Sequence, residues 1–373
     1  MNFDLPESTI EFRDQIRALI AEHVTAATIA DQHRTGTFSA PELLRALGAA
    51  GAIARVIPGI GSGDAIDLWL LCNELEIAAV PADDLGILLI VATIIAKIGN
   101  EHQRATILPA LLSGERRTCL GYSEADAGSD VAAITTRAVR TEGAWVINGA
   151  KMWTTMAHIA DWVILVTRTN LDAPKHQGLT MFLVPMTTPG ITVQPVHTMG
   201  TERTNATFYD NVRVGDECVL GEVNGGWDVM AIALAFERGV LGGTNPGVPL
   251  LREFHEWTQQ SGALNDPRVR EHMARVALDN ELATLLTQRA AWIAASGGLP
   301  GTEGSMAKLF ATEAYQRAAQ WLQDDAAPHS LLHAHPVDYH ARHSPVTTIY
   351  GGTSEINRNN IALRHLKLPR APR

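Results

Sequence analysis

Two short stretches of the chain carry residues suited to binding a flat polar ring. The first, Leu120 to Asp130, reads LGYSEADAGSD and combines small, acidic and hydroxyl residues that favour turns. The second, Asn148 to Thr155, reads NGAKMWTT and ends in a tryptophan followed by two threonines. Hydroxyl and backbone N–H groups placed in this way can donate hydrogen bonds to the edge of a ring. The two stretches together indicate one wall of a ligand site.

A β-hairpin is expected to join these stretches. Residues 134–141 alternate between two faces, Glu142-Gly143 form the turn, and residues 145–155 form the second strand. The same pattern is typical of an ordinary hairpin in a β-sandwich, which is the commoner outcome for period and turn residues alone. The rest of the chain has to decide between these two interpretations.

Composition restricts the class of protein. The chain has 373 residues, of which 46% are apolar and 19% charged, as in globular proteins, and its net charge of −10 argues against general nucleic-acid binding. Cys72, Cys119 and Cys218 are far apart, which is typical of free thiols in a reducing compartment. The acidic N-terminus has no secretory signal, and the most apolar run, Leu85 to Ile98, is too short for a membrane span. We expect a cytoplasmic protein that does not enter the membrane.

Hydrophobic periodicity divides the chain into three blocks. In residues 1–115 the spacing is helical throughout, and helices are expected over residues 7–24, 41–51, 67–80, 85–99 and 101–112. From residue 116 the period changes to two, and strands are expected over residues 134–141, 145–155, 162–167, 178–184, 191–194 and 206–214. Short strands separated by Pro, Gly, Asn and Asp predict an antiparallel barrel or sandwich.

Helical spacing returns in the last block, residues 226–373. Helices are expected over residues 227–239, 267–296, 303–324 and 353–365, and four helices in one block favour a bundle. The histidine-rich segment 329–343 is expected to be a loop, and no metal site is expected because the histidines lack a matching cysteine or carboxylate pattern. The fold class is therefore α+β, with domains at residues 1–115, 116–225 and 226–373.

Four local motifs resemble those of the acyl-CoA dehydrogenase family, and the resemblance covers essentially the whole chain. They are GYSEADAGSD at 121–130, similar to the family's TEPGAGSD, NGAKMWTT at 148–155, FERG at 236–239 and YGGTSEINRN at 350–359. Each motif alone is a weak signal, but four in the right order are specific. The resemblance implies an N-terminal helical domain, a middle antiparallel β-barrel and a C-terminal four-helix bundle, in agreement with the three blocks.

The reaction implied by the resemblance is the α,β-dehydrogenation of an acyl-CoA thioester with FAD as cofactor. A carboxylate removes the α-proton while a hydride passes from Cβ to flavin N5. Because the α-proton beside a thioester is only weakly acidic, hydrogen-bond donors must stabilise the enolate-like oxygen and water must be excluded. The chain is therefore expected to be an oxidoreductase acting on CH–CH bonds.

The same resemblance implies which residues contact the flavin. Ser123 would lie near the pyrimidine edge, Ser129 near a phosphate of cofactor or substrate, and Thr155 would hydrogen-bond toward N5. The full set implied for FAD is Leu120, Tyr122, Ser123, Gly128, Ser129, Trp153, Thr154, Thr155, Thr353, Ser354 and Glu355. The simpler alternatives are a polar loop with local turns for the first motif and a plain helix cap at Thr353 or Ser354.

The catalytic base is expected on the first helix of the last block. Many members of the family carry a glutamate where this chain has Gly351, and glycine cannot titrate. In the isovaleryl-CoA type the base lies in a segment that Phe236 to Gly239 resembles, so Glu237 is the implied base. Apolar residues on both sides of Glu237 would raise the pKa of its carboxyl group, although a glutamate paired with a neighbour is the commoner situation.

Three further residues are implied for the substrate side of the site. Arg238 would steer the thioester end of the ligand or hold a subunit contact. The backbone N–H of Gly351 or Gly352 would still serve as an enolate donor, since that role needs no side chain. Together with Ser129, these residues form the implied acyl-CoA site.

Two departures from the family pattern bear on the assembly. The stretch from Arg289 lacks the family's Arg-x-x-Phe-Gly segment, and residues 323–328 replace a glycine-rich turn. Both resemble a bacterial subset in which two different subunits share flavin sites in an α2β2 tetramer, including enzymes that act on steroid side-chain CoA esters. The expected partners are an acyl-CoA, electron-transfer flavoprotein as acceptor, and subunits of a homotetramer or an α2β2 heterotetramer.

Two other functions remain open on the sequence. One is a non-catalytic subunit that completes the flavin site of a related chain. The other is an enzyme of the same fold with different chemistry, such as a flavin oxidase, a monooxygenase or a carrier-protein dehydrogenase.

Overall fold

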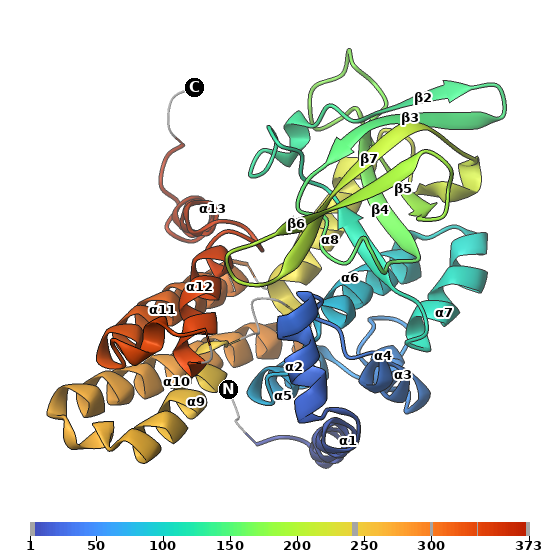
Figure 1. The fold of residues 1–373 in the computed structure, drawn as a ribbon. Helices are drawn as coiled ribbons and strands as arrows, with labels where there is room; N and C mark the ends of the chain where they lie inside the picture. The colour runs from blue at the N-terminus through green and yellow to red at the C-terminus, as the bar shows by residue number, and fades with distance from the viewer. Residues whose placement is uncertain (1–3, 241–244, 299–300, 334, 371–373) are drawn as a thin grey trace.

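The structure is a computed structural model that describes residues 4–240, 245–298, 301–333 and 335–370, without the side chains of residues 235, 237–240 and 336. Figure 1 shows three parts in chain order: a helical part at the lower right, a twisted sheet above it, and a helical part on the left. No helix among the described residues is long and apolar enough to cross a membrane.

The first part is helical, as predicted. Its helices are α1 (Glu7–His23), α2 (Ala26–Thr35), α3 (Pro41–Ala49), α4 (Ala52–Arg55), α5 (Ala65–Ile77), α6 (Asp83–Ile98) and α7 (Leu108–Leu112), with a π-helical turn at Gln103–Ile107 before α7. Helix α6 is buried on most of its surface because its charged residues, Asp83, Asp84 and Lys97, lie only in its terminal turns. The sequence reading missed α2, which starts at a capping box formed by Thr25 and Thr28.

The middle part is an eight-stranded sheet in the order β6-β7-β3-β2-β4-β5-β8, with β1 paired to β4. Its strands are β1 (Thr118–Gly121), β2 (Arg137–Thr141), β3 (Ala144–Lys151), β4 (Trp162–Arg168), β5 (Leu179–Pro185), β6 (Ile191–His197), β7 (Arg203–Val214) and β8 (Val219–Leu220). The predicted hairpin is present as β2 and β3, with its turn at Glu142-Gly143 and Gly143 at φ 71°.

The prediction of a closed antiparallel barrel is wrong. The outer strands β6 and β8 have no pairing with each other among the described residues, and the two-residue β8 is too short to close the sheet. Strand β1 pairs with β4 in the parallel direction, because the hairpin β2–β3 lies between them in the chain and the chain returns in the same sense. The sheet is therefore mixed and open.

Alternating residues of the central strands supply two separate cores. On β4, Ile164 and Val166 belong to the core shared with the N-terminal helices, whereas Val163 and Leu165 belong to the core on the other face. This follows from the two-residue period of a strand, and it explains why β4 is apolar from Trp162 to Val166 and buried on both faces.

The last part contains α8 (Gly226–Val240), α9 (Gly247–Ser261), α10 (Pro267–Ala295), α11 (Glu303–Asp325), α12 (Pro336–Thr347) and α13 (Ser354–Asn360). Helices α9 to α12 form the bundle, whereas α8 lies against α5, α6, β5 and α11, and α13 projects from the bundle (Figure 1). Helices α9 and α12 were not predicted. The expected loop at 329–343 is wrong over its second half, where α12 begins with its first turn capped by His335.

Candidate active site

Backbone and side-chain hydrogen bonds join the two stretches that were predicted to form one wall. The backbone N–H of Met152 donates to the carbonyl oxygen of Ser123 over 2.9 Å. From the neighbouring position, Lys151 Nζ donates to the carbonyl oxygen of Tyr122 over 3.1 Å. The loop after β1 is thus tied to the end of β3, and the wall predicted from the sequence exists in the fold.

A buried ion pair fixes the same junction. Lys151 is 1% exposed, and its Nζ lies 2.9 Å from Oε1 of Glu124. The Glu124 carboxylate also accepts hydrogen bonds from the backbone N–H groups of Thr135 and Thr136 over 2.7 and 2.9 Å. Burial alone raises the pKa of Glu124, but the Lys151 charge and these donors outweigh it and lower the pKa to about 2. Glu124 therefore stays ionised at neutral pH.

The end of β3 presents an aromatic ring to solvent. Trp153 is 56% exposed and has a φ of 64°, a conformation that is uncommon for a residue other than glycine. Thr154 is buried and exchanges hydrogen bonds with Asn205, through its N–H over 2.8 Å and its carbonyl over 3.0 Å. The indole of Trp153 is largely exposed and is therefore accessible to a ligand.

The other predicted residues of the first motif lie along an exposed turn. Leu120 lies in β1, where it pairs with Ile164 of β4. Tyr122 and Ser123 follow the strand and are half-buried. Gly128 and Ser129 are exposed, and a side chain at Gly128 would meet no neighbour within 4 Å. Thr155 lies at the end of the second motif, with its hydroxyl 3.5 Å from that of Thr204.

The predicted C-terminal residues form a turn and the start of α13. Gly351 and Gly352 have φ values of 63° and 84°, the pattern of a type I′ turn, which glycine adopts without strain. Thr353 caps α13 by accepting a hydrogen bond from the N–H of Ile356 over 3.2 Å. The alternative role of Thr353 as a helix cap is therefore confirmed. Capping does not exclude a contact between Thr353 and a ligand.

A pocket of about 560 Å³ lies between α11 and the start of α13. It is lined by Glu313, Gln316, Arg317, Gln320, Thr348, Ile349, Thr353, Ser354, Glu355 and Arg358. The hydroxyl oxygen of Ser354 is buried there without a hydrogen-bond partner among the described residues. Buried hydroxyls are normally hydrogen-bonded, so Ser354 adds an unused polar atom to the wall of this pocket.

Glu237 and Arg238 lie on α8, but their side chains are outside the described residues. The backbone of α8 is described, and Val229, Met230 and Ala233 anchor it in the core that also contains α6. The helix that carries the predicted base is thus part of the interface between the N-terminal helices, the sheet and α11.

Two carboxyl groups on the N-terminal helices were not predicted. Glu76 lies near the end of α5 and Asp83 at the start of α6, and burial raises the pKa of each to about 7. Asp83 is exposed whereas Glu76 is half-buried. Hydration therefore weakens the rise in pKa more at Asp83 than at Glu76. Both interact electrostatically with Tyr350, which directly precedes the glycine turn. Acidic residues at helix ends are common, so the sequence held no signal for this pair.

A polar contact between the sheet and the bundle was also missed. Glu202, in the loop between β6 and β7, pairs with His343 of α12 and accepts a hydrogen bond from Tyr339 Oη over 3.3 Å. The Tyr339 ring in turn stacks on His343, with ring centroids 5.3 Å apart. The sequence could not reveal this contact because α12 itself was expected to be a loop.

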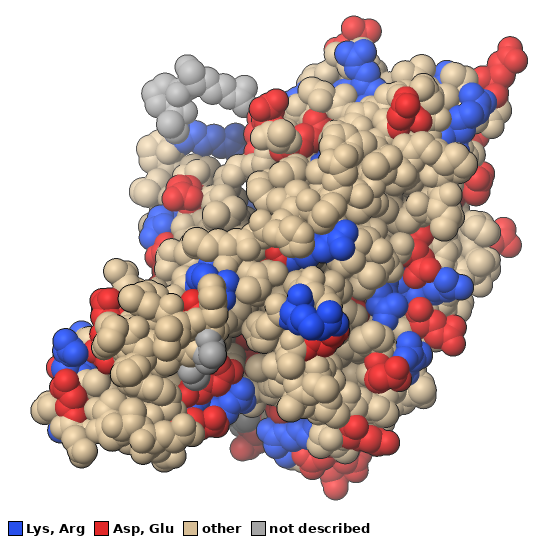
Figure 2. Space-filling view, viewed as in Figure 1, with Lys and Arg blue, Asp and Glu red and all other residues tan. Residues whose placement is uncertain are grey.

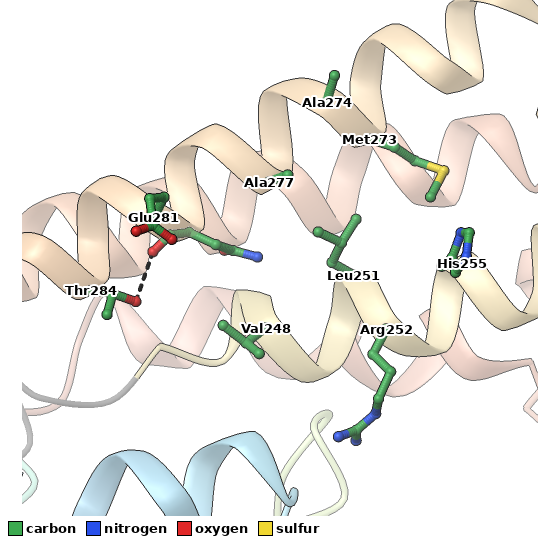
Figure 3. A pocket seen from close by; sticks show the side chains of 10 residues that line it. Val248, Leu251, Arg252, His255, Met273, Ala274, Ala277, Glu281 and Thr284 are labelled. Atoms are coloured by element: carbon green, nitrogen blue, oxygen red, sulfur yellow. Dashed lines mark hydrogen bonds between the residues drawn. The ribbon is translucent and has the colours of Figure 1, made fainter. Parts of the chain in front are cut away.

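A second hollow, of about 530 Å³, lies between α9 and α10 (Figure 3). Its lining is largely apolar, with Leu251, Met273 and Ala277 between the two helices and Glu281 and Thr284 toward one end. None of the residues predicted for cofactor or substrate lines this hollow. On the face shown in Figure 2, lysine and arginine side chains are scattered among acidic ones and do not gather in one broad area.

Comparison with known families defines the class. The chain matches the acyl-CoA dehydrogenase N-terminal domain over residues 6–115, the middle domain over 119–212 and the C-terminal domain over 224–366. The chain therefore belongs to the acyl-CoA dehydrogenase family, whose members are flavoprotein oxidoreductases that act on CH–CH bonds and use FAD.

Several individual members of the family are similar to this chain over most of its length. It is 38% identical to acyl-CoA dehydrogenase FadE34 of Mycobacterium tuberculosis (strain ATCC 25618 / H37Rv), over 84% of this chain but only 44% of FadE34. It is 35% identical to FadE26 of the same strain, over 83% of this chain and 82% of FadE26. A solved structure described as the Tcur3481-Tcur3483 steroid ACAD is 29% identical, covers 100% of both chains and has a TM-score of 0.88.

The described residues fit FAD. The exposed indole of Trp153 offers an apolar surface to the ring system, and the tied loop from Leu120 to Ser123 lies beside it. The unpartnered hydroxyl of Ser354 lies in a polar pocket that also holds Arg317 and Arg358, whose guanidinium groups pair with Asp279 and Glu313. The wall predicted from the sequence therefore offers aromatic, hydroxyl and backbone groups that suit this cofactor.

Proposed function

We propose that this chain dehydrogenates an acyl-CoA thioester between Cα and Cβ. The observation that carries the proposal is the buried Lys151–Glu124 pair, which ties the two motifs into one rigid wall beside an exposed tryptophan. A wall held in this way is prepared for a ring before the ring binds, which lowers the free-energy cost of binding. Bound FAD supplies the hydride acceptor.

Glu237 is proposed as the base that removes the α-proton. The sequence around it on α8 is apolar, and such surroundings raise the pKa of a carboxyl group toward the range useful for proton abstraction. Gly351 has no titratable side chain, but the N–H groups of Gly351 and Gly352 can donate to the thioester oxygen as negative charge develops on it. Arg238 and Ser129 are proposed to contact the acyl-CoA.

The proposed FAD contacts are those expected from the motifs. They are Leu120, Tyr122, Ser123, Gly128, Ser129, Trp153, Thr154, Thr155, Thr353, Ser354 and Glu355. The domain boundaries at residues 115 and 225 remain predictions of the same kind.

The substrate is proposed to be a branched or steroid side-chain acyl-CoA. Support comes from the likeness to the Tcur3481-Tcur3483 steroid ACAD, whose two-part name also supports an assembly of two different subunits. We propose an α2β2 heterotetramer in preference to a homotetramer, with electron-transfer flavoprotein as acceptor and the cytoplasm as location.

The test is flavin reduction by purified protein. The chain is expected to copurify with FAD, and acyl-CoA added without oxygen should bleach its absorbance near 450 nm. Glu237→Gln should retain the flavin and lose about 10²- to 10⁴-fold in bleaching rate, since a general base contributes that much. Glu142→Gln, at the exposed hairpin turn, is the control and should behave as the wild type.

Three outcomes would change the proposal. Full bleaching by Glu237→Gln would remove Glu237 from its role. Colourless protein that gains flavin only on co-expression with a related chain would show a half-site subunit. Rapid oxygen consumption without an added acceptor would show a flavin oxidase or monooxygenase.

A further inference from the structure

A buried lysine of the bundle contacts the glycine turn before α13. Lys308 lies on α11, is 3% exposed, and its Nζ donates to the carbonyl oxygen of Gly352 over 2.8 Å. The same oxygen accepts a hydrogen bond from Nδ2 of Asn357, also over 2.8 Å. Two side chains from different helices therefore fix the direction of one peptide carbonyl.

The turn itself presents free donors. In the described part of the chain, no acceptor meets the backbone N–H of Gly351, Gly352 or Thr353. The C=O of Gly352 and the N–H of Thr353 belong to one planar trans peptide and point in opposite directions. Because Lys308 and Asn357 hold that carbonyl, the N–H of Thr353 is directed away from them and toward the space in front of the turn.

This support matters because the turn cannot hold its own shape. Gly351 and Gly352 have the largest backbone freedom of any residue type, and neither has a side chain that could anchor it. Apart from its chain neighbours, a Cβ added at Gly351 would meet one atom of the described residues within 4 Å, Cε of Lys308 at 3.7 Å. Lys308 is thus one of two side chains, with Asn357, that restrain the turn from behind.

We propose that Lys308 is a positioning residue for the dehydrogenation, which fixes the turn at Gly351 and Gly352 so that its free N–H donors, the Thr353 N–H first among them, face the thioester oxygen of bound acyl-CoA. The inference rests on the proposed function. A cation on the Gly352 carbonyl also polarises that peptide, so that the Thr353 N–H becomes a stronger donor. Lys308 stabilises the enolate-like oxygen through the turn and does not touch the substrate.

The sequence contains a signal for this residue. Lys308 lies in the run Met306-Ala307-Lys308-Leu309-Phe310, where its neighbours are apolar. A charged residue within an apolar run is uncommon, and Lys308 shares this feature with Glu237. Its partner, 44 residues further along the chain, could be found only in the fold.

Two variants of Lys308 test the role. Lys308→Met removes the cation and the donor at similar length, and Lys308→Arg keeps both. The controls are the wild type and Thr312→Ala, which perturbs α11 one turn further along, where the Thr312 hydroxyl donates to the Lys308 carbonyl oxygen. For each protein we would measure FAD content, kcat and KM with an acyl-CoA that bleaches the wild type.

A second readout isolates the stabilisation of the enolate. An acyl-CoA analogue with sulfur in place of Cβ can lose the α-proton but has no hydride to transfer. Its deprotonation on the enzyme is followed by the long-wavelength absorbance that an enolate produces beside oxidised flavin, as a function of pH. A residue that only supported the fold would not move the midpoint of this titration.

Lys308→Met should keep its FAD, lose about tenfold in kcat with KM within twofold, and raise the midpoint by about one pH unit. Lys308→Arg should lie closer to the wild type, and Thr312→Ala should match it. The proposal is overturned if Lys308→Met keeps the wild-type kcat and midpoint, or if it loses FAD together with activity. If Lys308→Met does not fold, Lys308→Gln is judged by the same criteria. Failure of the wild type to bleach with any acyl-CoA would instead refute the proposed function, and the inference with it.

Discussion

Glu124 and Glu76 are both enclosed by protein, yet their surroundings have opposite effects on their protons. Glu124 meets Lys151 and two backbone donors, and its pKa falls to about 2. Glu76 has no hydrogen-bond donor among the described residues, and burial raises its pKa to about 7. In this chain the presence of partners, more than depth, decides whether a buried carboxylate stays ionised.

These opposite pKa shifts distinguish the loop at Glu124, whose carboxylate keeps its charge near neutral pH, from the α5–α6 junction at Glu76, whose charge changes there. The loop before the hairpin is held by a buried pair whose carboxylate, Glu124, stays ionised throughout the neutral range, while burial lowers the pKa of Lys151 to about 8. The junction of α5 and α6 carries two groups that change charge near neutral pH and interact with Tyr350, beside the glycine turn. Variants in the two regions should therefore differ in size and in pH dependence.

The largest effect is expected for Lys151→Met. This change leaves Glu124 buried and ionised without its cation, which should lower the free energy of unfolding by about 3 to 5 kcal/mol and abolish FAD retention. Urea unfolding and flavin absorbance after gel filtration measure the two effects.

Two controls define that result. Lys175→Met breaks an exposed pair with Asp130 near the same loop and should change the free energy of unfolding by less than about 1 kcal/mol. The double variant Lys151→Met with Glu124→Gln removes both charges but keeps an acceptor for the Thr135 and Thr136 N–H groups, and it should recover much of the loss because no unpaired charge is left buried. A double variant as unstable as Lys151→Met would contradict the ion-pair explanation.

An intermediate effect is expected for Glu76→Gln, and only above pH 5. The pKa of Glu76 in the folded protein, about 7, lies above its ordinary value of 4.5, so the folded state binds the proton more tightly. The stability from this group is therefore complete below about pH 4.5 and is lost as pH rises through 7. Glu76→Gln should exceed the wild type by about 1 to 2 kcal/mol at pH 8 and match it at pH 4.5, as followed by thermal unfolding. An equal difference at both pH values would contradict this assignment.

The smallest effect is expected for Asp83→Asn. The pKa of Asp83 is raised in the same direction, mainly by burial and then by Glu202, but its accessible surface lets water screen the charge. The gain in unfolding free energy at pH 8 should be about 0.5 kcal/mol, below that of Glu76→Gln. A larger gain than that of Glu76→Gln would show that accessible surface does not moderate the effect here.

Much of the fold was accessible from local pattern. The spacing of apolar residues located α1, α5, α6, α10 and α11 to within a few residues, because helical periodicity is a property of neighbouring residues. Helices α2 and α12 were missed since they carry many polar residues, and their stability comes from tertiary contacts such as Tyr315 with His340. The open, mixed sheet was missed because strand direction and closure depend on how distant strands meet.

For the site, the residue types were recognisable from sequence and their physical connections were not. The motifs around Ser123, Trp153 and Thr353 by themselves determined that this chain would offer hydroxyls, glycines and an indole to a ligand. Only the tertiary structure decided that Lys151 would neutralise Glu124, that Glu76 would be left without a donor, and that Lys308 would reach Gly352. The physical reason is that periodicity and turn chemistry act between neighbours along the chain, whereas burial and ion pairing depend on segments that approach only after folding.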